Sequence, residues 1–147
     1  MKIAVLGGGI FGCTAAIHAA RAEHEVHLFE KADALMQGAS AVNQFRLHRG
    51  YHYPRSPETG RECRIGNRSF CQEYGEAIIE PEKRKRGGQY YAIAREGSKV
   101  SSADYMRFLT ASKLPARPVP GSMAGLSEDH VECVFDVLES AIDPARL

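Results

Sequence analysis

The residues that most constrain the fold are three glycines close to the amino terminus. Residues 3–6 read Ile-Ala-Val-Leu, an apolar run that predicts a parallel strand buried on both faces. A G-x-G-x-x-G motif formed by Gly7, Gly9 and Gly12 follows directly. Gly7 lets the chain turn sharply, Gly9 leaves room for a ligand to approach the backbone, and Gly12 permits close packing of the next helix. The motif predicts a strand, a tight turn and a helix in succession.

A helix and a second strand are expected after the glycines. Small residues favour a helix from about Ile10 to Ala22, and residues 25–29 alternate as a strand that ends at Glu30. A helix N-terminus attracts phosphate, and a carboxylate after the second strand accepts hydrogen bonds from a ribose. The segment therefore predicts a dinucleotide site in which Glu30 disfavours a ribose 2′-phosphate. A glycine turn in an ordinary α/β domain is the alternative.

Length and composition are those of an ordinary globular protein. The 147 residues suffice for one core, or for one domain and part of another. With 44% hydrophobic residues, 25% charged residues and a net charge of +1, nothing points to nucleic acid or to a membrane. Because the first strand begins at once and no apolar run is long enough to span a bilayer, a cytoplasmic location is expected. The cysteines lack C-x-x-C spacing and are expected to be reduced thiols.

The segment after Glu30 makes the cofactor more specific. Residues 38–40 read Gly-Ala-Ser, and residues 43–48 read Asn-Gln-Phe-Arg-Leu-His. Through these residues the chain resembles the D-amino-acid-oxidase-like superfamily of flavin-dependent oxidoreductases, which includes amine, amino-acid and 2-hydroxy-acid oxidases. The resemblance implies FAD as the cofactor. It also implies an α/β fold, in which a Rossmann-like FAD-binding βαβ segment is followed by the start of a mixed α+β substrate domain.

The resemblance assigns roles to individual residues. Residues 38–40 are expected to line the pyrophosphate and ribityl chain. Arg46 and His48 are the candidate catalytic residues, because cationic or hydrogen-bonding groups beside the flavin ring stabilise its anionic reduced form. An ordinary structural role stays open for His48 and His52, and no metal ligand is expected. The predicted cofactor-binding residues are Gly7, Gly9, Ile10, Phe11, Gly12, Glu30, Lys31, Gly38, Ala39, Ser40, Asn43 and Gln44.

Arginines are frequent between residues 46 and 68, a segment that contains six arginines and two acidic residues. This excess is suited to an anionic substrate or a second phosphate. The sequence favours such a site for Arg46, Arg49 and Arg55, which alternate with aromatic residues. Residues 57–77 are expected to form a helix that starts after Ser56, a candidate N-cap. The other three arginines are interpreted as the solvated face of that helix: Arg61, Arg64 and Arg68. The Lys-Arg-Lys-Arg run at residues 83–86 is interpreted as a charged turn.

The second half predicts a strand at residues 89–94, a capped helix at 101–112, a proline-rich connection and a strand at 131–138. The predicted domains are an FAD-binding segment at residues 1–80, a partial substrate domain at 81–139 and the start of a return into the FAD domain at 140–147. By the resemblance, the chain corresponds to the amino-terminal part of a family-sized enzyme. It would therefore be truncated.

Two functions of different classes follow. The first is an FAD-dependent oxidoreductase, or its amino-terminal fragment, that oxidises an amine, amino acid or 2-hydroxy acid by hydride transfer to flavin. The alternative is a non-catalytic dinucleotide-binding or subunit-interaction protein, and an NAD-dependent dehydrogenase is disfavoured. The expected partner is a small-molecule substrate. Because two strands do not complete a doubly wound sheet, a fragment, a partner chain and a homo-oligomer all stay open.

Overall fold

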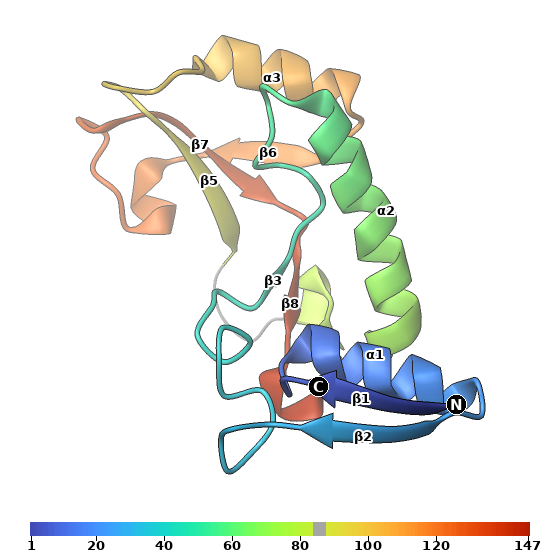
Figure 1. The fold of residues 1–147 in the computed structure, drawn as a ribbon. Coiled ribbons are helices and arrows are strands. Elements are labelled where there is room, and N and C mark those ends of the chain that lie inside the picture. The colour runs from blue at the N-terminus through green and yellow to red at the C-terminus, as the bar shows by residue number, and fades with distance from the viewer. Residues whose placement is uncertain (84–87) are drawn as a thin grey trace. The chain divides into compact units, whose positions relative to one another are not determined.

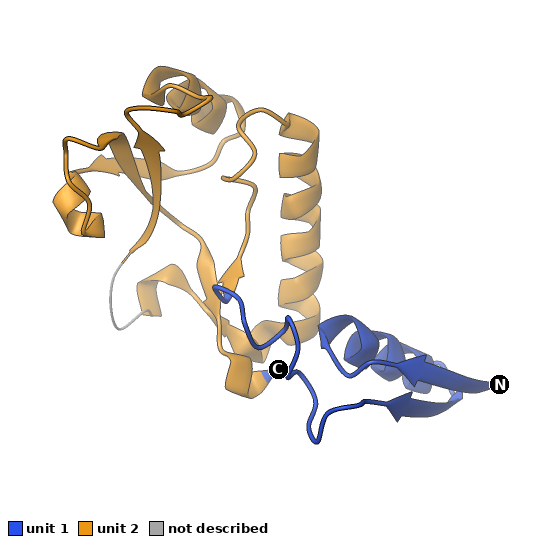
Figure 2. Ribbon diagram, turned by 60° about the vertical axis from the view of Figure 1, so that its left-hand side comes forward, with its two compact units in different colours: residues 1–45, 147 blue, residues 46–146 orange. Residues whose placement is uncertain are grey.

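The computed structural model describes residues 1–83 and 88–147 (Figure 1). The chain forms two compact units (Figure 2). Unit 1 contains residues 1–45 and Leu147, and unit 2 contains residues 46–146. The units therefore divide after Phe45, whereas the predicted FAD-binding segment extends to residue 80. The domain limits at residues 80 and 139 stay a prediction, because compactness alone assigns no function.

Unit 1 is built on a parallel strand pair, β1 (Lys2–Leu6) and β2 (Glu25–Phe29), joined by the helix α1 (Ile10–Arg21). This is the strand–helix–strand order that the glycine motif predicts. The expectation that β1 is buried on both faces is wrong, because burial alternates along both strands and Leu6 is 83% exposed. In unit 1 the sheet has two strands and α1 packs on one face of it, so the other face keeps its apolar side chains in solvent.

Unit 2 holds its main core under an antiparallel sheet of order β5–β7–β6, formed by β5 (Gln89–Ala94), β7 (Val131–Val137) and β6 (Ala116–Val119). The helix α3 (Ser102–Ala111) supplies Tyr105, Phe108 and Leu109 to the core cluster. Val137 is completely buried in the same cluster. Burial of several aromatic and aliphatic side chains, each worth about 1.5–3 kcal/mol, makes this cluster the main source of stability in unit 2.

A second antiparallel sheet in unit 2 joins segments that are far apart in the sequence. Its order is β3 (Arg46–Leu47), β8 (Ser140–Ile142) and β4 (Ile78–Ile79). The long helix α2 (Pro57–Tyr74) leads from β3 towards β4. Short 3₁₀ helices lie at Gly75–Ala77, Pro81–Lys83, Gly121–Ala124 and Pro144–Arg146. The pairing of β3 with β8 is what brings residues near 46 to residues near 140.

Most predicted elements of unit 2 are present. The strand at residues 89–94 is confirmed, and Ser101 caps α3 by accepting a hydrogen bond from the Asp104 amide at 3.1 Å. The expected helix at 57–77 is α-helical to Tyr74 and continues as a 3₁₀ turn, and Ser56 makes no side-chain cap. Four strands in the described part of unit 2 were not predicted: the short β3 and β4, β6 in the proline-rich connection, and β8 in the expected return segment. Most of the basic run at 83–86 lies outside the described residues.

Candidate functional site

The glycine turn of unit 1 depends on the absence of side chains. Gly7 has φ +102°, a conformation that L side chains rarely adopt, and its amide donates to the Phe29 carbonyl at 2.8 Å. A Cβ on Gly12 would lie 1.8 Å from the carbonyl oxygen of Gly7. The start of α1 therefore packs directly on the turn, in a contact that only glycine permits.

The carboxylate of Glu30 is fixed by two backbone amides. Gly8 N donates to Oε2 at 2.6 Å, and Ala32 N donates to Oε1 at 2.9 Å. These two hydrogen bonds, Ala32 first, lower the pKa of the Glu30 carboxyl, so it is ionised at neutral pH. Gly8 is a residue that sequence reasoning missed. A Cβ on it would lie 2.6 Å from Leu35 Cδ2, and the only sequence signal was its place within a run of three glycines.

The side chain of Ser40 contacts the first residue of α1. Its Oγ accepts a hydrogen bond from Ile10 N at 3.0 Å, and a Cβ on Gly9 would lie 3.3 Å from the same oxygen. The first bond of the helix is from Cys13 N to the Gly9 carbonyl. The amides of Phe11 and Gly12 therefore have no acceptor within the helix. The side chain of Phe11 is 89% exposed.

Several other predicted residues are exposed in the segment that follows Glu30. Asn43 Nδ2 donates to the carbonyls of Ala39 and Ser40, both at 3.2 Å, which fixes the local loop. Lys31 is exposed, and its charge adds to the lowering of the Glu30 pKa. Three further residues are exposed, and their cofactor roles stay predictions: Gly38, Ala39 and Gln44.

These features of unit 1 fit the adenosine diphosphate half of FAD. The glycines would leave backbone open to a diphosphate, and the positive end of α1, with two amides that have no acceptor within the helix, would suit its charge. Two backbone amides orient the Glu30 carboxylate. Its remaining lone pairs can accept hydrogen bonds from ribose hydroxyls.

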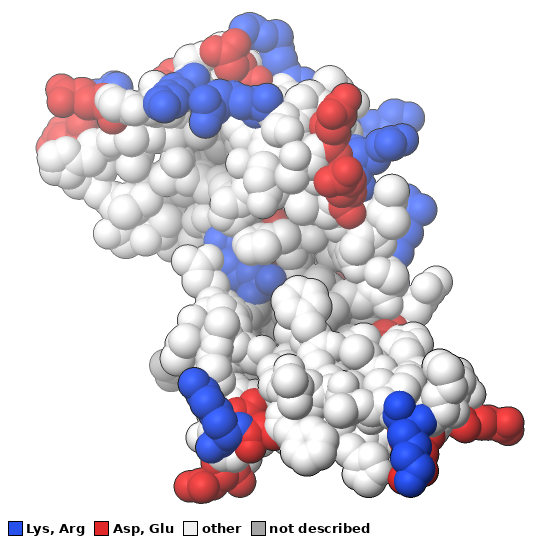
Figure 3. Space-filling model, in the orientation of Figure 1, with Lys and Arg blue, Asp and Glu red and all other residues white. Residues whose placement is uncertain are grey.

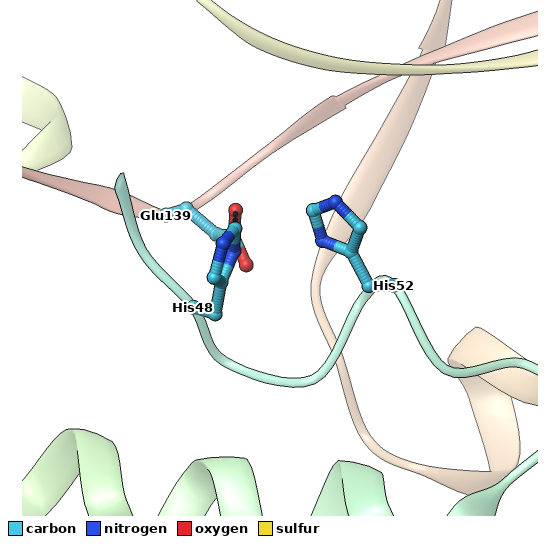
Figure 4. A group of neighbouring side chains, drawn as sticks. All are labelled: His48, His52 and Glu139. Atoms are coloured by element: carbon cyan, nitrogen blue, oxygen red, sulfur yellow. Dashed lines mark ion pairs between the residues drawn. The ribbon is translucent and has the colours of Figure 1, made fainter. Parts of the chain in front are cut away.

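Unit 2 contains a buried carboxylate with several donors around it. Glu139, at the junction of β7 and β8, is 0% exposed. Arg46 Nη2 lies 2.8 Å from its Oε2, and the amide of Arg49 donates to Oε1 at 2.9 Å. His48 and His52 come from the loop that follows β3 (Figure 4). His48 Nδ1 lies 3.5 Å from Oε2 of Glu139.

Aromatic rings extend this cluster. The hydroxyl of Tyr91 donates to Glu139 Oε2 at 3.1 Å and also contacts His52 Nδ1. The Arg46 guanidinium lies over the Tyr91 ring, 4.7 Å from its centroid, and the rings of His48 and His52 meet edge to face at 4.5 Å. The two predicted catalytic residues therefore belong to one network, which we call the Glu139 cluster: Arg46, His48, His52, Tyr91 and Glu139.

The charges of the Glu139 cluster are balanced within it. Burial alone would raise the pKa of the Glu139 carboxyl, but His48, the Arg49 amide and the Arg46 charge together lower it. Burial, followed by the charge of Glu139, raises the pKa of the Tyr91 hydroxyl, which stays a donor at neutral pH. Burial, and then the neighbouring His48, lowers the pKa of His52. The carboxylate thus carries the negative charge of the cluster, and Arg46 the opposing positive charge.

Ligand atoms of His48, His52 and Glu139 lie within 4.8 Å of one another, a spacing that would also suit a metal ion. The carboxylate, however, already accepts hydrogen bonds from Arg46, Arg49 and Tyr91. Because Arg46 neutralises it, little charge is left to attract a cation, and we interpret the group as a hydrogen-bonding network.

Sequence reasoning missed Glu139 and Tyr91. Glu139 lies 93 residues from Arg46, and no local pattern distinguishes it from the surrounding strand residues. A structural role was left open for His48 and His52, and both belong to the network.

The sequence is similar to those of known FAD-dependent proteins. A family described as FAD dependent oxidoreductase matches residues 2–147. The chain is 39% identical over 135 residues to the FAD-dependent monooxygenase FPY4 of Fusarium mangiferae, which covers 90% of the chain and 35% of that protein. It is 38% identical over 82 residues to the FAD-dependent monooxygenase kojA of Aspergillus flavus and to a probable one of Aspergillus oryzae, which covers 56% of the chain and 19% of each protein.

The chain thus spans between about a fifth and a third of the length of these curated relatives. None of the helices in residues 1–83 and 88–147 combines the length and the apolar character that crossing a bilayer requires.

Proposed function

Because the chain belongs to the family of FAD-dependent oxidoreductases, we propose that unit 1 binds FAD and that the protein oxidises an amine, amino acid or 2-hydroxy acid. The observation that carries the proposal is the glycine turn with its fixed carboxylate. Gly12 admits no side chain, and Glu30 is oriented by two amides. A turn and an acid held in this way suit a diphosphate and a ribose in one ligand.

Each residue of the turn has a defined part in this proposal. The amides of Phe11 and Gly12 donate to the diphosphate at the positive end of α1, and Gly9 keeps the approach open. Ser40 orients the Ile10 amide through its hydroxyl. The Glu30 carboxylate accepts hydrogen bonds from the hydroxyls of the adenosine ribose.

FAD supplies the acceptor for a hydride that leaves the substrate carbon, while the substrate nitrogen or oxygen loses a proton and a C=N or C=O bond forms. We assign Arg46 and His48 to the reactive ring on the chemistry of the Glu139 cluster. Arg46 is held by its ion pair with Glu139, and its buried Nε has no hydrogen-bond partner among the described residues. Such a donor stabilises negative charge that develops next to it. Glu139 is a positioning residue, because it acts through Arg46.

The relatives favour a second candidate. Proteins 38–39% identical to this chain are named FAD-dependent monooxygenases. In that reaction one atom of O₂ enters the substrate, the other leaves as water, and an external donor supplies two electrons. The residues of the glycine turn would serve both reactions equally. A non-catalytic protein that keeps the dinucleotide site is the remaining alternative.

Anaerobic mixing of the FAD-loaded protein with substrates separates these candidates. Loss of the yellow flavin absorption on addition of an amine, amino acid or 2-hydroxy acid alone supports the proposed oxidation. Reduction only by a reduced nicotinamide, followed by incorporation of labelled O₂ into a product once that gas is admitted, contradicts it and supports the monooxygenase. Bound flavin that neither kind of donor reduces supports the non-catalytic alternative.

A further inference from the structure

Unit 2 contains a pocket of about 250 Å³ that is lined by cations. Three segments form it: the loop after β3, the middle of α2, and the connection from α3 to β6. Its polar lining comes from Arg49, Tyr51, Arg64, Asn67, Arg68 and Lys113. No acid lines the pocket in the part of the chain that the structure describes. Lys and Arg side chains are also visible along the outer edge of α2 in Figure 3.

Within residues 1–83 and 88–147, the charged side chains of this pocket have no carboxylate partner. Arg46, Arg117 and Arg146 each form an ion pair with an acid. By contrast, no such pair is found within residues 1–83 and 88–147 for Arg64 or Lys113, nor for the neighbouring Arg68. Nη1 of Arg64 is buried and has no hydrogen-bond partner among the described residues. A buried guanidinium donor without an acceptor is unfavourable, and an incoming anion would offset this cost.

The walls of the pocket are held in place by contacts that do not use these free donors. Tyr51 is 0% exposed, and its hydroxyl donates to the Pro115 carbonyl at 2.6 Å. Arg49 Nη1 donates to the Leu138 carbonyl at 3.0 Å. Lys113 has φ +53° at the end of α3, so the backbone itself turns there. The pocket is therefore formed without a ligand, and its walls carry the four cations.

We propose that this pocket binds a phosphate group of a small molecule. Four positive charges without a lining acid match a dianion better than a single carboxylate. Arginine forks bind phosphate oxygens in pairs, and lysine adds a point charge. The inference is independent of FAD binding by unit 1. It revises the interpretation of Arg64 and Arg68 as a solvated helix face.

The test is calorimetric titration of the purified protein with inorganic phosphate at low ionic strength. The wild type binds one phosphate per chain, and Arg64→Gln weakens binding about tenfold or more. The matched control is Arg61→Gln, which makes the same charge change on α2 at a residue that does not line the pocket. It is expected to stay within about twofold of the wild type. Circular dichroism checks that both variants are folded.

Four results would overturn the proposal. If the wild type does not bind phosphate, the pocket is not a phosphate site. If Arg61→Gln and Arg64→Gln weaken phosphate binding equally, the binding reflects general surface charge. Acetate binding as tight as phosphate binding identifies a carboxylate pocket instead. Loss of phosphate binding after saturation with FAD means that the bound phosphate belongs to the flavin. Unchanged phosphate affinity in the FAD-loaded protein supports a separate ligand.

Discussion

Replacement of Gly12 by alanine tests the glycine turn most severely. The new Cβ would lie 1.8 Å from the Gly7 carbonyl oxygen, and real Cβ atoms essentially never come closer than 3.0 Å to such an atom. The turn and α1 would have to separate by about 1.2 Å, and since the opposing atom is backbone, no rotamer change relieves the clash. Such overpacking costs about 1–3 kcal/mol of folding free energy.

The same displacement moves the first amides of α1 away from the proposed diphosphate. Loss of one charge-assisted hydrogen bond, worth about 1.5–3 kcal/mol, weakens FAD affinity roughly ten- to a hundredfold. The assay is a flavin fluorescence titration, with a urea unfolding curve on the same sample. Gly66→Ala is the control, because its Cβ meets nothing within 4 Å and alanine favours the helix. FAD affinity of Gly12→Ala within twofold of the wild type would refute the role of the turn.

Other predictions concern unit 2. Glu139→Gln leaves the Arg46 guanidinium without its buried partner and is expected to lower the free energy of unfolding by about 3 kcal/mol, measured in urea. Because the pKa of Glu139 is lowered on folding, its stabilisation is complete above the ordinary value of 4.5 and is lost as pH falls through the lowered value. The difference between wild type and Glu139→Gln should shrink over that acid range, and a constant difference would contradict the assignment. Gly50→Ala places a Cβ 2.6 Å from the Gly60 carbonyl at φ +100°, so urea should unfold it at a lower concentration, unlike Gly66→Ala.

Local patterns predicted the local elements well. The apolar run, the glycines and the alternation at residues 25–29 define β1, α1 and β2, because each signal lies within the element it predicts. The strand β6 was missed because Pro118 reads as a break. The structure places β6 at an edge of its sheet, where proline is tolerated.

The elements that escaped prediction depend on distant partners. The strands β3, β4 and β8 have two or three residues each, and pairing across the chain, rather than propensity, defines them. Glu139 enters the site through this pairing, so it could not be recognised from its neighbours in sequence. The burial of Leu6 was mispredicted for a similar reason, since an apolar run does not reveal whether one or both faces of its strand are covered.

The central claim is that unit 1 binds FAD through the carboxylate of Glu30. Titration of FAD into the wild type, Glu30→Gln and Glu25→Gln tests it most directly. Glu25 is an exposed acid at the other end of β2, paired with Lys2 and His27, so it controls for the charge change. The predicted result is binding by the wild type, about tenfold weaker binding by Glu30→Gln and no change in Glu25→Gln. A wild type that binds no FAD, or a Glu30→Gln variant with unaltered affinity, would contradict the claim.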